Sequence, residues 1–109
     1  MEYLGKVEKF LLAHIKYAYA GKIYYSSTSS DAKDFLASMF AEEFISPSER
    51  MYQKLKEAFK DGFKKLQEYW MIEISGYTVG LTSYGEQVVN NIKEEDYEKL
   101  KEDISKGNI

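Results

Sequence analysis

The stretch LQEYWMIEISGYTVGLTSYGEQVVNNI, residues 66–92, decides the fold of this 109-residue chain. It contains two runs rich in β-branched and aromatic residues, WMIEI at 70–74 and YTVGL at 77–81. Only Ser75 and Gly76 separate the two runs, and a two-residue connection that contains glycine is typical of a β-hairpin. The stretch therefore predicts two antiparallel strands in the second half of the chain.

Helices are predicted on the C-terminal side of this hairpin. Thr82 or Ser83 caps a helix that runs to about residue 92, and Ser83 with Glu86 has the spacing of a capping box. A terminal helix follows to about Ser105, either continuous with the preceding helix or broken near 94–96. It is predicted because three apolar residues share one side of it: Tyr97, Leu100 and Ile104.

A long amphipathic helix is predicted before the hairpin, from residue 47 to about 69. Ser46 is placed to cap it, Pro47 suits the first helical position, and Glu49 is spaced to reach back to the cap amide. Gly62 within its apolar arc permits either a close approach by another element or a kink. The arc consists of positions that recur at the helical period: Met51, Leu55, Ala58, Phe59, Gly62, Leu66, Tyr69 and Trp70.

The N-terminal part predicts two further helices and a short strand. Apolar spacing indicates a helix over about 2–20 that ends at Gly21, and residues 23–25 have the composition of a strand. Ser30 is placed to cap a helix over 31–44. The apolar stripe of that helix consists of Ala32, Phe35, Leu36, Met39 and Phe40.

Length and composition limit the class of protein. The chain predicts a single domain over 1–109, with a core over about 3–92 and a helical extension over 93–109. No apolar run approaches the roughly 20 residues of a membrane span, and the first ten residues lack a secretory signal, so we expect a cytoplasmic protein. With no Cys, one His and no phosphate-binding glycine loop, we expect no enzyme, no metal and no cofactor.

The order of predicted elements is helix, strand, helix, helix, hairpin, helix, and it resembles the winged-helix variant of the helix-turn-helix. Leu-Thr at 81–82, followed by Gly85 and by Val-Val at 88–89, is similar to the "LT, two residues, G" pattern of MarR-, ArsR- and PadR-like regulators. The resemblance covers about residues 3–92. It implies a mostly helical α+β fold, a winged helix-turn-helix with a short three-stranded sheet and a C-terminal helix.

Charge is distributed unevenly along the chain. The net charge of −3 argues against a nucleic-acid partner, but residues 50–65 carry six bases against two acids. Bases every few residues on a helix are also typical of a solvated face. Charge alone therefore leaves both interpretations open.

The resemblance makes the helix that starts at Pro47 the recognition helix, which enters the major groove with its N-terminal half. Arg50 and Gln53 have the donors to read guanine and adenine edges, and Ser46 and Ser48 add phosphate contacts at the positive helix end. Three lysines suit further phosphates: Lys54, Lys60 and Lys64. For each of these residues, a solvated surface position is the alternative.

The sequence departs from this pattern at the hairpin tip, residues 75–77, which is uncharged where many wings carry Arg or Lys. The helix over 31–44 ends in Glu42 and Glu43, so this end points away from any bound DNA. These two carboxylates are interpreted as a solvated helix end. His14 is interpreted as a partly buried structural residue, with pH sensing or ligand binding as the alternative.

Aromatic residues gather near the end of the first helix, where core packing and dimer contacts are competing interpretations. They are Tyr17, Tyr19, Tyr24 and Tyr25. Regulators of the resembled type commonly dimerise through terminal helices, so we expect a homodimer formed by the first and last helices. The predicted function is sequence-specific binding of double-stranded DNA as a dimeric transcriptional regulator. The alternatives are a winged-helix protein-interaction module and a DNA-binding plasmid partition or replication factor.

Overall fold

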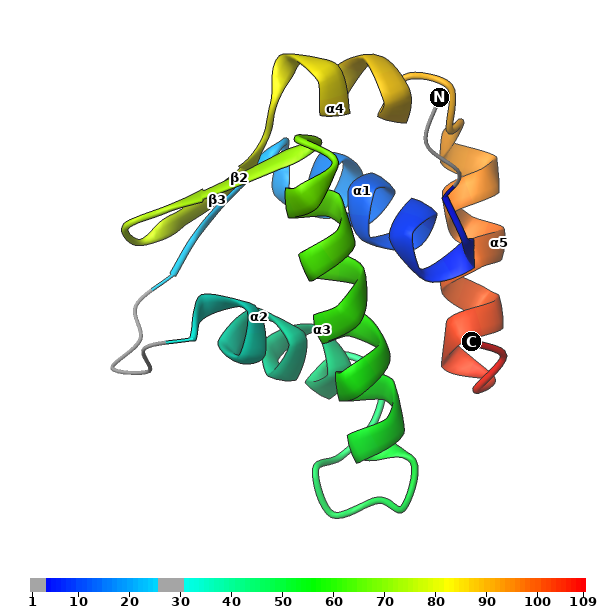
Figure 1. The fold of residues 1–109 in the computed structure, drawn as a ribbon. Helices are drawn as coiled ribbons and strands as arrows, with labels where there is room; N and C mark the ends of the chain where they lie inside the picture. Colours follow the sequence, from blue (N-terminus) through cyan, green and yellow to red (C-terminus); the bar gives the residue numbers. More distant parts are fainter. Residues whose placement is uncertain (1–3, 26–30) are drawn as a thin grey trace.

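The computed structural model describes residues 4–25 and 31–109. Over these residues the chain forms five helices and a small three-stranded antiparallel sheet (Figure 1), which confirms a mostly helical α+β fold. The elements are α1 (Lys6–Tyr19), β1 (Lys22–Tyr24), α2 (Ala32–Glu42), α3 (Tyr52–Glu68), β2 (Ile72–Ser75), β3 (Thr78–Leu81), α4 (Ser83–Val89) and α5 (Glu94–Ser105).

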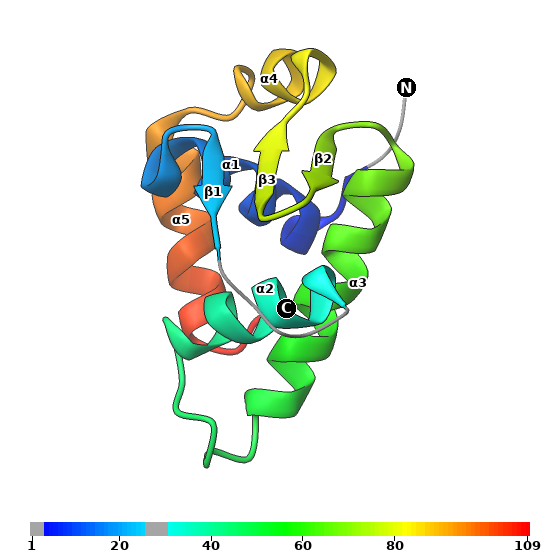
Figure 2. The ribbon, with the colours of Figure 1, turned by 90° about the vertical axis from the view of Figure 1, so that its left-hand side faces the viewer.

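The predicted hairpin forms the larger part of the sheet. β3 lies in the centre, with β2 on one side and β1 on the other, and both pairings are antiparallel. Gly76 closes the hairpin with a φ of +58°, a left-handed conformation that favours glycine. Figure 2 shows the three strands side by side with α1 behind them. One face of the sheet is thus buried, and its buried residues are Ile23, Ile72 and Val79.

α1 is the central helix of the domain. Its residues 10–15 are all buried, because α3 packs along one side of it and α5 along the other (Figure 1). A Cβ added at Gly62 of α3 would lie 2.6 Å from the Cδ1 of Leu11, so glycine permits the close approach of the two helices. α3 continues without interruption through Gly62. The close approach, rather than a kink, explains this glycine.

The segment after the hairpin is held by Thr82 and Gly85. Thr82 is the N-cap of α4: its hydroxyl accepts from the backbone N–H of Gly85 at 3.0 Å and donates to the carbonyl of Trp70. A Cβ at Gly85 would collide with the carbonyl oxygen of Met71. Of the two predicted caps, Thr82 is the one that forms, and Ser83 with Glu86 does not make the predicted capping box.

The predicted start of α3 is wrong by five residues, because the helix begins at Tyr52 instead of Pro47. The N–H of Glu49 bonds to the carbonyl of Ser46, and that of Tyr52 bonds to the carbonyl of Glu49. These bonds close tight turns, not helical turns. Ser46 is hydrogen-bonded to Ser48, at 3.0 Å between the hydroxyls, and does not cap the helix.

Other helix ends also differ from prediction. α1 begins at Lys6, where Gly5 is the N-cap and Glu8 bonds to its amide; residues 2 and 3 of the predicted range lie outside the described residues. Asp31 caps α2 through the N–H groups of Lys33 and Asp34, and the predicted cap Ser30 also lies outside the described residues. The terminal helix is separate from α4, and the break lies at 90–93.

Candidate nucleic-acid interface

Five of the residues predicted to contact DNA lie together where α3 begins. Ser46, Ser48 and Arg50 are exposed on the turns before the helix, and Gln53 and Lys54 are exposed on its first turn. All five fall within the nine consecutive residues 46–54, at one end of the molecule (Figure 1). The structure therefore gathers hydroxyl, carboxamide, ammonium and guanidinium donors on one exposed segment.

The start of α3 has the electrostatic character of an anion site. Its N-cap, Met51, makes no side-chain hydrogen bond to the helix, and the first turn contains no acidic residue. First-turn N–H groups and the helix dipole both favour negative charge at such an end. Arg50 and Lys54 add two positive charges, although the neighbouring Glu49 offsets one of them. The segment is weakly cationic and rich in donors.

Lys60 and Lys64, in the middle of α3, are placed differently from the first five residues. The Nζ of Lys60 lies 3.3 Å from Oδ2 of Asp31, the N-cap of α2, and 3.5 Å from Oδ1 of Asp34 in the first turn of that helix. Lys56 lies 3.5 Å from Asp34 Oδ1 in the same seam. Lys64 is exposed. Two of the six bases of 50–65 are thus paired with acids within the chain.

These ion pairs also affect proton binding at the seam. Burial raises the pKa of Asp31, but the backbone N–H of Asp34 and the ammonium of Lys60 outweigh it and hold the pKa below its ordinary 3.8. The hydrogen bond to Asp31 in turn raises the pKa of Lys60. The basic cluster seen in the sequence is therefore partly neutralised.

Three exposed aromatic residues lie around the sheet, and none of them was assigned to the predicted DNA site: Tyr24, Trp70 and Tyr77. Trp70 was predicted on the buried arc of the helix but is 77% exposed. The reason is that α3 ends at Glu68 and Trp70 has a φ of +60°, which takes its side chain off the helical period. Tyr24 follows buried Ile23 on β1. Because side chains alternate between the two faces of a strand, this position could have indicated from the sequence that Tyr24 is exposed. Met51, also predicted on the arc, is exposed as well.

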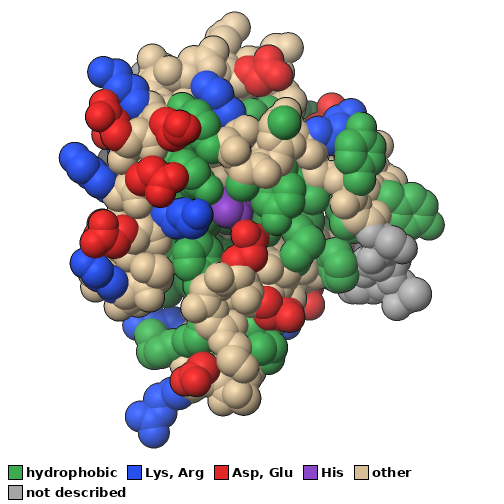
Figure 3. Space-filling model, turned by 180° about the vertical axis from the view of Figure 1, so that it is seen from behind, with side chains coloured by type: hydrophobic (Ala, Val, Ile, Leu, Met, Phe, Trp, Pro, Cys, Tyr) green, Lys and Arg blue, Asp and Glu red, His purple; other side chains and the backbone are tan. Residues whose placement is uncertain are grey.

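His14 is more deeply buried than predicted and joins three helices. Its Nδ1 lies 2.7 Å from the hydroxyl of Tyr97 on α5, and its Nε2 lies 3.2 Å from both carboxylate oxygens of Glu43 at the end of α2. Phe10 stacks on the imidazole ring at 4.9 Å. Figure 3 shows the histidine (purple) on the back of the molecule, with hydrophobic side chains and charged side chains next to it. Glu43 lies exposed at the end of α2, as predicted, and is in addition a partner of His14.

The tyrosine of this cluster is also perturbed. Burial, with the carboxylates of Glu98 and Glu43, raises the pKa of Tyr97 to about 12. The ring of Tyr17 stacks on Tyr97 at 5.3 Å, and the Tyr17 hydroxyl donates to the carbonyl of Ile92 at 2.7 Å. These tyrosines thus make contacts within the chain, where α5 packs on α1.

Comparison with known proteins gives no relative. A scan against protein-family models finds no match, and searches of curated proteins and of solved structures find none either. In residues 4–25 and 31–109, no helix is long and apolar enough to cross a membrane. Function is therefore argued from the site alone.

Proposed function

We propose that the protein binds double-stranded DNA in a sequence-specific manner, with the turns before α3 and its first turn placed in the major groove. The observation that carries this proposal is the exposure of Arg50, Gln53 and Lys54 at a helix start that no side chain caps. A guanidinium reads guanine and a carboxamide reads adenine, while Lys54, Ser46 and the first-turn N–H groups bind phosphates.

The arrangement of elements supports the same proposal. Two helices, α2 and α3, are followed by the β2–β3 hairpin, and β1 pairs with β3 to complete the sheet. This order resembles that of the winged helix-turn-helix, and in this proposal α3 acts as the recognition helix. In this proposal Lys64 contacts a phosphate farther along α3, and Lys60 does so only when it leaves Asp31 and Asp34.

In this proposal the protein acts as a homodimeric transcriptional regulator. A two-fold dimer places two copies of α3 on half-sites about one helical turn apart and so multiplies a modest affinity. The middle of α1 is enclosed within its own chain. The outward face of α5 and the exposed ends of α1 are therefore the surfaces proposed for the second copy. A plasmid partition or replication factor differs only in the DNA that it recognises.

A protein-binding module is the second candidate, and the exposed aromatic residues favour it. Trp70 and Tyr77 are 77% and 68% exposed, and large aromatic side chains are enriched at protein interfaces. The hairpin, residues 72–81, carries no Lys or Arg for a DNA groove. The net charge of −3 agrees with this candidate as well.

Fluorescence anisotropy of a labelled random duplex, at roughly 50 to 200 mM salt, separates the candidates. The proposal expects log affinity to fall linearly with log salt. Replacing both Arg50 and Lys54 by alanine is expected to weaken binding at least about tenfold and to lower the salt slope by about 1, since Lys54 contacts a phosphate and Arg50 a base. The matched control replaces Lys22 and Lys65, two exposed lysines on β1 and in the last turn of α3, by alanine, because neither lies at the start of α3 or on the proposed dimer surface. It removes the same charge and is expected to bind as the wild type.

Two outcomes contradict the proposal. Equal weakening by both double variants means that net charge alone drives binding. No binding of the wild-type protein at the lowest salt leaves the protein-binding candidate, which predicts that Trp70→Ala and Tyr77→Ala abolish capture of a partner.

A further inference from the structure

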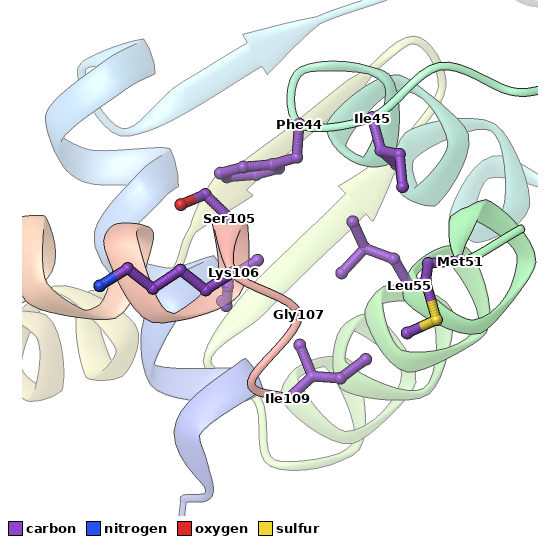
Figure 4. Close-up of a pocket in the computed structure, with 9 residues that line it drawn as sticks. Phe44, Ile45, Met51, Leu55, Ser105, Lys106, Gly107 and Ile109 are labelled. Atoms are coloured by element: carbon purple, nitrogen blue, oxygen red, sulfur yellow. The ribbon is translucent and has the colours of Figure 1, made fainter. Parts of the chain in front are cut away.

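A small pocket lies at the end of the molecule where α3 begins. It has a volume of about 160 Å³, is open to solvent on one side, and is lined by three segments: the turn after α2, the first turn of α3, and the end of α5. Figure 4 shows Ile45, Met51 and Leu55 on one side of the opening and the C-terminal turn on the other, with Ile109 below. The pocket exists because α5 packs on α1 and leaves the end of α3 uncovered.

The walls of this pocket are apolar. Phe44, Ile45, Leu55 and Ile104 form its inner part, and Leu55 and Ile104 are buried. The side chains of Met51 and Ile109 lie at its rim and are exposed. A ligand that covers these exposed apolar atoms removes them from water, and this burial favours binding.

Several polar groups of the walls bond within the chain. The hydroxyl of Ser105 donates to the carbonyl of Glu102 at 2.7 Å, and the Nζ of Lys106 lies 2.9 Å from Glu102 Oε1. The N–H of Gly107 donates to the carbonyl of Ile104, and that of Ile109 donates to the carbonyl of Gly107. Lys106 is 62% exposed and its Nζ points away from the other lining side chains (Figure 4), so a charged or strongly hydrogen-bonding group against the apolar inner walls loses its water without gaining a partner there.

We propose that this pocket binds a small, uncharged, apolar molecule of the size of one six-membered ring. Volume sets the size, since an apolar cavity of about 150 Å³ is known to hold one benzene molecule. The walls determine the chemistry of the ligand, because their inner part offers apolar contact and no free polar group. Met51 at the rim adapts its shape to the ligand, since its thioether side chain is flexible. This inference goes beyond DNA binding and does not depend on it.

Methyl NMR spectra of the full chain test the proposal with toluene as the probe. Toluene is expected to cause saturable shifts confined to the methyl groups of the pocket: Ile45, Met51, Leu55, Ile104 and Ile109. Benzoate has the same ring with a carboxylate, and is expected to cause no shift at these methyl groups over the same concentrations. Agreement on both probes supports the site and its chemistry.

A pair of matched variants locates the site. Met51→Trp adds bulk at the rim and is expected to weaken toluene binding at least about tenfold. Tyr77→Trp, at the exposed hairpin tip, is expected to bind as the wild type. The proposal is overturned if toluene causes no saturable shift, if benzoate binds as well, or if Met51→Trp has no effect. It is also overturned if these methyl groups shift with protein concentration alone, since the occupant is then a second copy.

Discussion

The first turn of α3 and its middle carry similar side chains in different surroundings. At the start, Arg50 and Lys54 are exposed, and the turn contains no acid. In the middle, Lys56 and Lys60 lie 3.3 to 3.5 Å from carboxylates of α2. Because the second pair is neutralised within the chain, lysines on one helix do not offer equal positive potential to a partner.

The largest expected effect comes from reversing the charges at the start of α3. Arg50→Glu with Lys54→Glu is expected to lower duplex affinity at least about a hundredfold, because each contact is worth about 1–3 kcal/mol and repulsion is added. Anisotropy at fixed salt measures the loss. Lys56→Gln with Lys60→Gln is the comparison, and it is expected to lower affinity less than about threefold. Equal losses in the two double variants would remove the distinction between the two regions.

A third region of the same helix, its buried side, is expected to affect stability instead of binding. Gly62→Val places methyl groups against Leu11, which is fully buried, and overpacking of this kind costs about 1–3 kcal/mol. Urea unfolding measures the loss. Asp61→Val, at the exposed neighbouring position, is expected to cost less than about 1 kcal/mol, the helix propensity of valine alone. If the two variants are equally stable, α1 does not approach α3 as closely as described.

The buried side of α3 was largely predictable from the sequence, and the charge pairing was not. Helical period placed Gly62 and Leu66 in the core, because the spacing of apolar residues is local information. The hairpin was predictable for the same reason, from Ser75 and Gly76 between two strand-like runs. The bond from Lys60 to Asp31 depends on how α2 packs on α3, which no local pattern contains. The sequence therefore showed a basic segment where the structure has a partly neutral one.

The start of α3 was mispredicted because the same residue types serve caps and turns. Ser46, Pro47 and Glu49 match a capping box, but serine and proline also favour tight turns. The chain takes the turns and begins the helix at Tyr52, whose side chain is buried. The partnership of Glu43 with His14 was missed for a different reason, since 29 residues separate them. Such contacts become visible only when the helices are packed.

Releasing the lysines of the seam is expected to make the middle of α3 resemble its start. Asp34→Asn removes the carboxylate that Lys56 and Lys60 share. Duplex affinity is expected to rise a few-fold, and the salt slope to steepen by about 1, since Lys56 becomes available to a phosphate while Lys60 keeps its contact with Asp31 at 3.3 Å. Stability is expected to fall by less than about 1 kcal/mol, because the carboxylate is partly exposed. Unchanged affinity would mean that DNA does not reach this part of the helix.

The smallest expected effect is on the proton equilibrium of Asp31. Its folded pKa lies below the ordinary 3.8, so the ionised carboxylate contributes stability above that value, which is lost as pH falls through the folded pKa. Lys60→Met is expected to raise this pKa toward 3.8, whereas Lys54→Met, at the helix start, leaves it unchanged. Carboxyl ¹³C NMR titration measures the midpoints. Equal Asp31 midpoints in the wild type and in Lys60→Met would contradict the contribution of Lys60 to this pKa, and with it the contact to Asp31 that distinguishes Lys60 from the lysine at the start of α3.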